Sequence, residues 1–177
     1  MSAFLGIDTS NYTTSAALFD SEANTIIQSK KLLPVKAGEL GLRQSDAVFA
    51  HVKQLGDMVQ NVFDEYREEI TAIGVSTRPR DIDGPYMPCF LVGEMAASCL
   101  GAALKVPVLP FAHQQGHVAA ALYSAGRLDL FRERFIAFHL SGGTTEALLV
   151  EPGAERIIRC TKISGSMDLK AGQAVDR

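Results

Sequence analysis

Apolar residues alternate with polar ones, or recur every three to four residues, along most of the chain, which predicts a mixture of strands and helices. Three short β-branched and apolar runs, separated by Asn11, Asp20 and Asn24, are typical of an antiparallel meander at the N-terminus. The next segment has apolar residues at helical spacing, including Val52, and Ser45 is its expected N-cap. The expected elements are strands at 3–8, 13–19, 25–32, 71–76 and 106–110, and helices at 46–67, 90–104 and 113–124.

The sequence resembles itself at a shift of 131 residues. Residues 4–32 align with 135–163 without a gap, and both segments carry a Thr-Thr pair in the turn before the second strand. A period this long fits two copies of one domain rather than a solenoid. We therefore expect a first copy over 1–131 and a truncated second copy over 132–177. The order of strands and helices predicts an α/β fold, in which helices cover a mixed sheet.

Composition narrows the class of protein. With 47% apolar and 21% charged residues, the chain is neither disordered nor collagen-like, and no apolar run approaches the ~20 residues of a membrane span. Three cysteines without paired spacing fit a reducing cytoplasm, and Cys99, within a helical pattern, is expected to be buried and inert. A net charge of −3 argues against charge-driven nucleic-acid binding. We expect a cytoplasmic protein with no membrane partner.

His113 and His117 form the motif HQQGH, directly after the strand expected at 106–110. Histidines at positions i and i+4 share one helix face, so both imidazoles can reach one metal ion. Gln114 occupies the place of the general-base glutamate of an HExxH zinc protease, and two ligands are too few for a tight site. The motif therefore fits either a metal pair or a capping histidine beside a solvent-exposed one. Its place at the carboxyl end of a strand favours a ligand site.

Two turns between strands combine hydroxyls with glycine or aspartate. The turn SGGTT at 141–145 lets backbone N–H groups approach an anion closely, although a plain glycine hairpin has the same pattern. The equivalent turn at 8–14 begins with Asp8, which fits either a metal-bound phosphate or an Asx turn. Phosphate turns in both copies would clamp one nucleotide. Another loop offers Arg78 and Arg80 to an anionic substrate, or is simply solvated.

These motifs occur together, in the same order, in one known family. LGIDTSNYTTSAAL (5–18), LVG (91–93), HQQGH, SGGTT and DLKAGQAVDR (168–177) resemble the N-terminal half or more of a Gcp/TsaD-like protein. This family comprises the tRNA threonylcarbamoyladenosine synthases, formerly described as O-sialoglycoprotein endopeptidases or glycoproteases. It is part of the actin/Hsp70/sugar-kinase superfamily of duplicated, RNase H-like domains. The resemblance therefore implies an actin-like ATPase fold.

The resemblance also implies a reaction and a set of site residues. Family members transfer a threonylcarbamoyl group from its adenylate to N6 of an adenosine in tRNA. His113 and His117 would be two ligands of an iron or zinc ion, and the third, an aspartate, would lie in the family's C-terminal part, which this chain lacks. The implied partners are tRNA and a paralogous ATPase-fold protein. The residues expected to bind ATP or an adenylate are Leu140, Ser141, Gly142, Gly143, Thr144, Asp8, Ser10 and Gly172.

Several motif positions depart from the family's pattern, which indicates a divergent paralogue. Acidic residues, a histidine and a glycine-proline-glycine loop are replaced. The replacing residues are Gln115 for the glutamate of HMEGH, Thr144 for the histidine of SGGH, Tyr12 and Thr13 for the acidic pair of ETSCDE, 77–87 for the glycine-rich loop, and Leu169 for a substrate-binding aspartate.

We therefore expect a metal- and nucleotide-dependent threonylcarbamoyl (carbamoyl-type) transferase that is inactive as the isolated 177-residue chain. The alternative is a non-catalytic ATPase-fold binding module, acting as heterodimer partner of a true synthase; the lost acidic residues favour it, and the retained histidine pair disfavours it. A metallo-glycoprotease ranks third, because the sequence has no evident catalytic glutamate or nucleophile set. A truncated second copy would expose apolar surface, so we expect the isolated chain either to be marginally stable or to dimerise through that surface.

Overall fold

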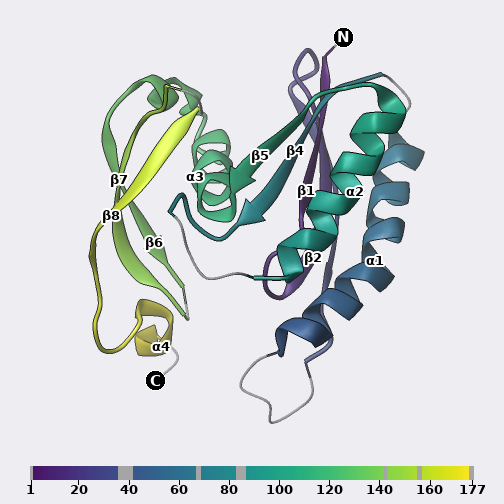
Figure 1. Ribbon diagram of the computed structural model, residues 1–177. Coiled ribbons are helices and arrows are strands. Elements are labelled where there is room, and N and C mark those ends of the chain that lie inside the picture. Colours follow the sequence, from purple (N-terminus) through teal and green to yellow (C-terminus); the bar gives the residue numbers. More distant parts are fainter. Residues whose placement is uncertain are drawn as a thin grey trace. The chain divides into compact units, whose positions relative to one another are not determined.

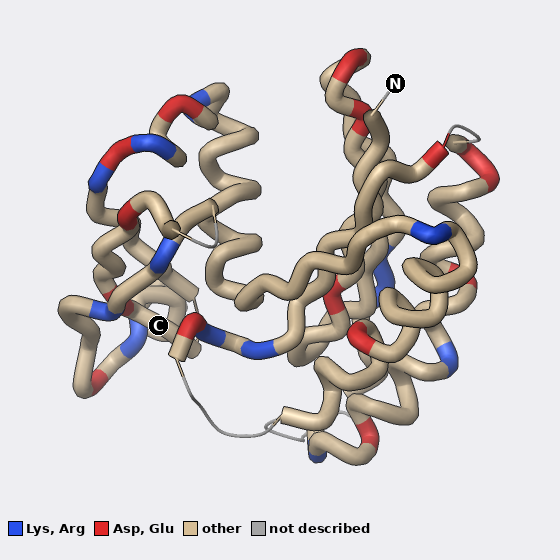
Figure 2. Tube along the Cα trace, turned by 45° about the horizontal axis from the view of Figure 1, so that its top comes forward, with Lys and Arg blue, Asp and Glu red and all other residues tan. Residues whose placement is uncertain are grey.

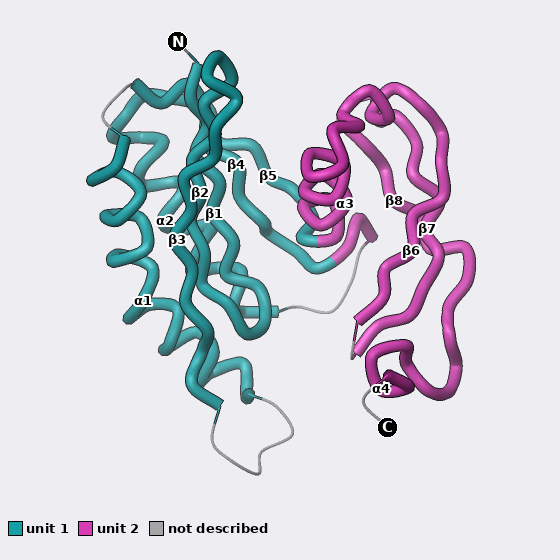
Figure 3. Tube along the Cα trace, turned by 180° about the vertical axis from the view of Figure 1, so that it is seen from behind, with its two compact units in different colours: residues 1–79, 83–113 teal, residues 80–82, 114–177 magenta. Residues whose placement is uncertain are grey.

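The computed structural model divides the chain into two compact units (Figure 3). The first comprises Met1–Pro79 and Asp83–His113, and the second comprises Arg80–Ile82 and Gln114–Arg177. The structure describes residues 2–35, 42–66, 69–82, 87–141, 143–154 and 157–175.

A five-stranded mixed sheet forms the first unit (Figure 1). Its central strand, β1 (Ala3–Asp8), pairs antiparallel with β2 (Thr13–Asp20) and parallel with β4 (Ile70–Arg78). The edge strands are β3 (Thr25–Leu32), which pairs with β2, and β5 (Val108–Ala112), which pairs with β4. The parallel strands β1, β4 and β5 therefore end at the same edge of the sheet, where α/β sheets commonly bind ligands.

Two helices lie side by side on one face of this sheet (Figure 1). α1 (Gln44–Glu65) packs on β2 and β3, and α2 (Cys89–Leu104) packs mainly on β4. Because side chains alternate between the two faces of a strand, every second residue of the inner strands points at these helices. The resulting core includes Leu5, Ile7, Ala16, Leu18, Leu55, Val62, Ile73, Val75, Val92 and Ala97.

Most of the expected elements are confirmed, with differences at their ends. α1 has Arg43, not Ser45, as its N-cap, because the Arg43 carbonyl accepts the first helical N–H bonds. Val52, expected on the buried face of α1, is exposed and lies beside the buried stripe. β4 extends to Arg78, so this arginine ends a strand rather than lying in a loop. β5 begins two residues later than expected, because the Val106 N–H closes the end of α2.

The second unit is an antiparallel meander with α3 packed on one face. β6 (Phe135–Leu140), β7 (Thr145–Pro152) and β8 (Ile158–Gly165) pair in that order. α3 (His113–Ser124) starts at the last residue of the first unit, and η1 (Leu128–Arg132) follows it. The short α4 (Ala171–Val175), which follows β8, is the last helix described. The core of this unit comprises Val118, Leu122, Leu148, Val150, Ile158 and Cys160.

The first hairpins of the two units have the same register but bury opposite faces. β1 and β2 pair Leu5 with Leu18, and β6 and β7 pair Ile136 with Leu149, each displaced by 131 residues. Leu5 is buried under helices, whereas Ile136 and Phe138 are 56% and 72% exposed. Two copies of one domain, displaced by 131 residues, must pair their strands in the same register. The duplication, its 131/132 boundary and dimerisation through an exposed apolar face stay predictions.

Charged residues of both signs are spread over both units (Figure 2), which agrees with the small net charge of −3. Every helix in the described part of the chain is too short or too polar to cross a membrane.

The three cysteines differ in their surroundings. Cys89 and Cys160 are buried, whereas Cys99 is exposed, so the expectation that Cys99 is buried was wrong. A helical pattern of small residues does not say which face of α2 packs on the sheet, and position 99 lies on the outer face. Burial raises the pKa of Cys160 to about 11 and also raises the pKa of Cys89.

We predict that one thiol of the native chain reacts rapidly with an aromatic disulfide reagent near neutral pH. Cys99 is exposed, whereas burial disfavours the reactive thiolate of the other two cysteines. Absorbance of the released thiolate measures the rate. Cys99→Ser should remove the fast phase, and Cys160→Ser should leave it unchanged; equal rates for all three thiols would contradict the prediction.

Candidate functional site

A hydrogen-bonded cluster surrounds the carboxylate of Asp8 at the carboxyl end of β1. Its Oδ1 accepts the backbone N–H of Ser10 at 2.8 Å and the Ser10 hydroxyl at 2.5 Å. Its Oδ2 accepts the Ser76 hydroxyl at 2.5 Å and lies 2.8 Å from Nδ1 of His113. One carboxylate thus links the ends of β1 and β4 to the first residue of α3.

This arrangement keeps Asp8 ionised. Burial alone would raise the pKa of Asp8, but the hydrogen bond and charge of His113 and the hydroxyls of Ser10 and Ser76 outweigh burial. The pKa therefore lies well below its usual range. An ionised carboxylate 2.8 Å from Nδ1 favours a proton on that nitrogen and fixes the orientation of the His113 ring.

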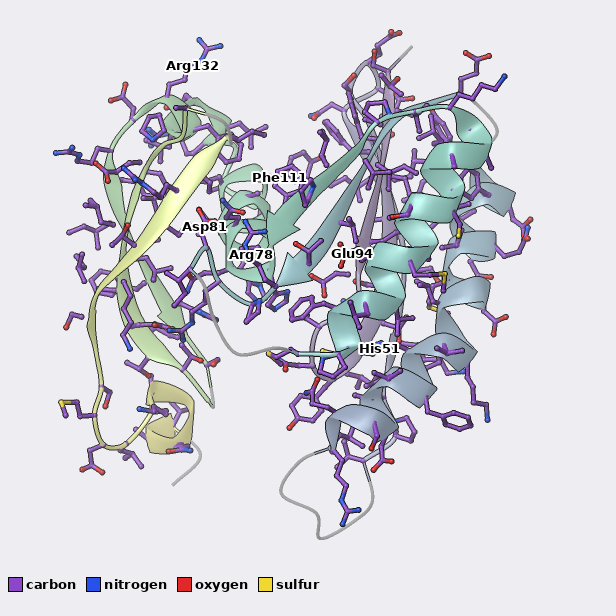
Figure 4. All side chains as sticks on the ribbon, in the orientation of Figure 1. His51, Arg78, Asp81, Glu94, Phe111 and Arg132 are labelled. Atoms are coloured by element: carbon purple, nitrogen blue, oxygen red, sulfur yellow. The ribbon has the colours of Figure 1, made fainter. Side chains whose placement is uncertain are left out.

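A second polar group joins β2 to α1 and includes His51, which is labelled in Figure 4. The Thr14 hydroxyl donates to Oε1 of Gln54 at 2.9 Å, so it accepts from Nδ1 of His51 at 2.8 Å. Burial lowers the pKa of His51, and its Nε2 is buried without a hydrogen-bond partner in the described part of the chain. Burial thus favours the neutral imidazole, which is hydrogen-bonded to Thr14 near the start of β2.

The same turn anchors α2. The Thr9 hydroxyl donates to the carbonyl of Cys89 at 2.8 Å and accepts the N–H of Gly93 at 3.1 Å. A Cβ at position 93 would lie 2.9 Å from this hydroxyl oxygen. The glycine of the LVG motif thus allows α2 to approach the end of β1 closely.

The turn between β6 and β7 closes on itself. The N–H of Ser141 donates to the carbonyl of Thr144 at 2.7 Å, and the N–H of Thr144 donates to the Ser141 hydroxyl at 2.9 Å. The N–H of Gly172 donates to the Ser141 carbonyl at 3.2 Å. Three expected nucleotide-binding residues therefore lie together, while Leu140, beside them, is 59% exposed.

A buried carboxylate with two cationic neighbours lies on the α3 side of the same hairpin. The side chain of Glu146 is 1% exposed, and its Oε1 pairs with Nη2 of Arg80 at 2.5 Å. Its Oε2 lies 3.6 Å from Nζ of Lys162. The guanidinium of Arg80, expected to meet an anionic substrate, thus has a carboxylate of the protein as partner. The anion-loop hypothesis stays a prediction.

The second histidine of HQQGH contacts a histidine that the sequence did not single out. The rings of His117, on α3, and His139, on β6, have centroids 5.3 Å apart and planes tilted by 47°. His139 pairs across the strands with Glu146, so both residues lie on the face that α3 covers. Histidine rings therefore gather at the N-terminal end of α3.

The structure brings together some of the expected site residues. Asp8, Ser10 and His113 form one cluster, whereas Arg78, at the end of β4 (Figure 4), donates to the Thr77 hydroxyl at 3.2 Å. Gly142 lies outside the described residues. Within the described ranges, no group of three histidine, cysteine, aspartate or glutamate side chains could hold a metal ion.

Several site residues are not indicated by any sequence motif, among them Ser76, His139 and Glu146. Ser76 is a hydroxyl at a strand end, which is common and carries no signal by itself. The 131-residue repeat, however, does point to His139 and Glu146. A shift of 131 carries the pair Asp8–Ser15 onto His139–Glu146, and these are cross-strand partners in both hairpins.

We predict that Arg80→Met lowers the free energy of unfolding by about 2–3 kcal/mol, because it leaves a buried carboxylate with only Lys162 as cationic neighbour. Urea denaturation followed by circular dichroism measures this loss. Replacing both partners, as in Arg80→Met with Glu146→Leu, should recover much of it, since no buried charge remains. Equal stability of Arg80→Met and wild type would contradict a buried pair.

Comparisons with solved structures establish the fold. YeaZ from Pseudomonas aeruginosa superposes with a TM-score of 0.56 at 20% identity, covering 94% of this chain and 67% of that chain. The ethanolamine utilization protein EutJ from Carboxydothermus hydrogenoformans gives a TM-score of 0.50 at 14% identity, covering 96% of this chain and 53% of that one. The expected actin-like ATPase fold is confirmed.

Comparisons of sequence establish the family. The family model for tRNA N6-adenosine threonylcarbamoyltransferase, TsaD, matches residues 23–177. Proteins of this name from Aromatoleum aromaticum and Nitrosospira multiformis are 30% and 31% identical to the chain, covering 98% of it and 48% of their own length. The chain thus spans about half the length of the curated relatives it matches. It belongs to the TsaD family of tRNA N6-adenosine threonylcarbamoyltransferases.

Proposed function

We propose that this chain supplies the metal- and nucleotide-binding part of a threonylcarbamoyl transferase that acts on tRNA. The observation that carries the proposal is the bond between Asp8, at the end of β1, and His113, at the start of α3. The HQQGH motif thereby begins at the edge where β1, β4 and β5 end, next to a hydroxyl-rich turn. Strand ends with such donors are where this class of fold binds nucleotides.

In the proposed reaction, the N6 amine of adenosine attacks the carbonyl carbon of the threonylcarbamoyl adenylate. The new C–N bond forms, the bond to AMP breaks, and the amine loses a proton. Ser10 and the turn around Ser141 and Thr144 would orient the adenylate, because hydroxyls and backbone N–H groups bind phosphate oxygens. By the same family membership, tRNA and a paralogous ATPase-fold protein are the proposed partners.

The residues present fit a metal ion of the iron or zinc class. His113 and His117 are one helical turn apart, and an imidazole whose Nδ1 faces a carboxylate is a typical metal ligand. A bound ion would supply Lewis-acid polarisation of the carbamoyl group. His113 and His117 would hold it, and Asp8 would fix the orientation of His113.

The alternative proposal is a binding module that takes part in the reaction without catalysing it. The sequence favours it at two motifs, where Tyr12 and Thr13 replace an acidic pair and Leu169 replaces an aspartate. Such a module would bind nucleotide in the same fold but would not need the histidines of α3.

Calorimetric titration of the chain with ATP, with and without Zn²⁺, separates the two proposals. We predict that Zn²⁺ strengthens ATP binding and that His113→Ala lowers the zinc-dependent affinity about tenfold or more. Arg127→Ala, which removes an exposed ion pair with Asp129, is the matched control and should bind as the wild type does.

Each outcome has a distinct meaning. ATP binding of equal strength with and without Zn²⁺, and unchanged in His113→Ala, would contradict the metal-dependent transferase and favour the binding module. Absence of ATP binding under both conditions would contradict both proposals.

A further inference from the structure

The side chain of His51, on α1, is 0% exposed and lies within the first unit (Figure 4). α1 packs on β2 and β3, and His51 has no part in the proposed metal site. Histidine is the side chain that ordinarily changes its charge between pH 5 and 8. The contacts of its two ring nitrogens therefore decide whether the buried ring can carry a charge.

A chain of hydrogen bonds that runs in one direction fixes Nδ1 of this ring. The amide Nε2 of Gln54 donates to the carbonyl of Leu32 at 3.3 Å, so Oε1 of Gln54 faces Thr14. The Thr14 hydroxyl donates to this oxygen at 2.9 Å and accepts from Nδ1 of His51 at 2.8 Å. The chain joins α1 to the start of β2 and the end of β3. It needs a proton on Nδ1, which neutral and charged rings both supply.

The difference between the two charge states lies at the other nitrogen, Nε2. This atom is buried and has no hydrogen-bond partner among the described residues. In the neutral ring Nε2 carries a lone pair, whose burial costs far less than the burial of a charge. Burial accordingly lowers the pKa of His51, although the charge of Asp8 and the backbone of Asn11 act in the opposite direction.

The titratable groups on the neighbouring elements do not compensate a charge on this ring. Asp8, at the end of β1, already accepts bonds from four donors. Lys31, the cross-strand partner of Thr14, is positively charged, and burial raises the pKa of the Cys89 thiol on α2. The other charged residues of α1, α2 and β3 are exposed, and they are Asp46, Lys53, Asp57, Asp64, Glu65, Glu94 and Lys30.

The ring supports a turn that needs support. Asn11, in the turn between β1 and β2, has a φ of 45°, a left-handed conformation that L-residues adopt only where the surrounding contacts hold it. The N–H of Leu33 donates to the carbonyl of Tyr12 at 2.8 Å, which ties the turn to the end of β3. Thr14 lies directly after this turn, so its bond to His51 ties the turn to α1 as well.

We propose that His51 is a positioning residue, whose neutral ring fixes the turn at 8–14 through Thr14 and whose protonation releases that turn. The inference rests on the proposed function only for what the turn binds, an adenylate or ATP. The clamp itself is a property of the first unit and makes the order of the turn depend on pH.

The direction of this dependence follows from the two charge states. Below pH 6.5, the ordinary pKa of histidine, the released state takes up a proton that the clamped state excludes. The clamp is therefore complete above pH 6.5 and weakens as the pH falls below it. One proton changes the equilibrium constant for release by up to about tenfold per pH unit.

Hydrogen exchange of the ligand-free chain, followed by NMR at pH 7.5 and 5.5, tests the proposal. We expect the protection factor of the Leu33 amide, which bonds the turn, to fall about tenfold or more at pH 5.5. The Ser166 amide, which donates to the Thr145 carbonyl in the second unit, should keep its protection factor.

Two variants separate the titration of His51 from its packing. His51→Asn keeps an N–H donor for Thr14 but does not titrate, so the Leu33 protection factor should be the same at both pH values. Val52→Asn, at an exposed position beside it on α1, is the matched control and should keep the wild-type pH dependence. The ¹⁵N shifts of the wild-type ring provide a test without any substitution, and we expect a neutral ring at pH 7.5 with its proton on Nδ1.

Three results would overturn the inference. The first is the same pH dependence in His51→Asn and wild type, and the second is equal loss of protection at Leu33 and Ser166. The third is a wild-type ring that becomes charged near pH 6.5 while the Leu33 protection factor stays constant. None of them involves ATP or metal, so the proposed function would stand. Conversely, absence of ATP binding at both pH values would contradict the proposed function and leave the clamp intact.

Discussion

The hydrogen bonds of a single carboxylate, Asp8, organise the edge of the first unit's sheet at which β1 and β4 end. Asp8 ends β1, the central strand, and accepts bonds from its own turn, from β4 and from the first residue of α3. Burial of a charge is costly unless it is fully hydrogen-bonded, and four donors meet this requirement here. The position of His113 therefore depends on a charge that the rest of the cluster stabilises.

In the second unit, the equivalent hairpin packs through its opposite face. Its hairpin has the register of the first but packs on α3 through the other face, so the apolar residues Ile136 and Phe138 lie exposed where Leu5 and Ile7 are covered. At the end of its covered face, polar residues replace the apolar core. Glu146 pairs with Arg80 and His139 contacts His117, and these contacts lie beside the turn at Ser141.

The strands of the meanders and the helices at 90–104 and 113–124 were predictable, because their patterns of apolar residues are strong and local. The start of α1 was not, because Ser45 is a good N-cap by type, whereas the cap that formed uses the backbone of Arg43. His113 and Asp8 could be proposed as site residues from their places at strand ends. Their contact joins residues that are 105 positions apart, which no local pattern encodes. His139 and Glu146 were missed because a strand pattern predicts which residues face inward but not what they meet there.

We propose that the histidines of α3 hold a metal ion beside a turn that binds nucleotide. The most direct test is extended X-ray absorption fine structure of the zinc-loaded chain. We expect a shell of nitrogen atoms at about 2.0–2.1 Å, with the outer-shell scattering of at least two imidazoles. A shell of oxygen atoms alone, without imidazole scattering, would contradict it.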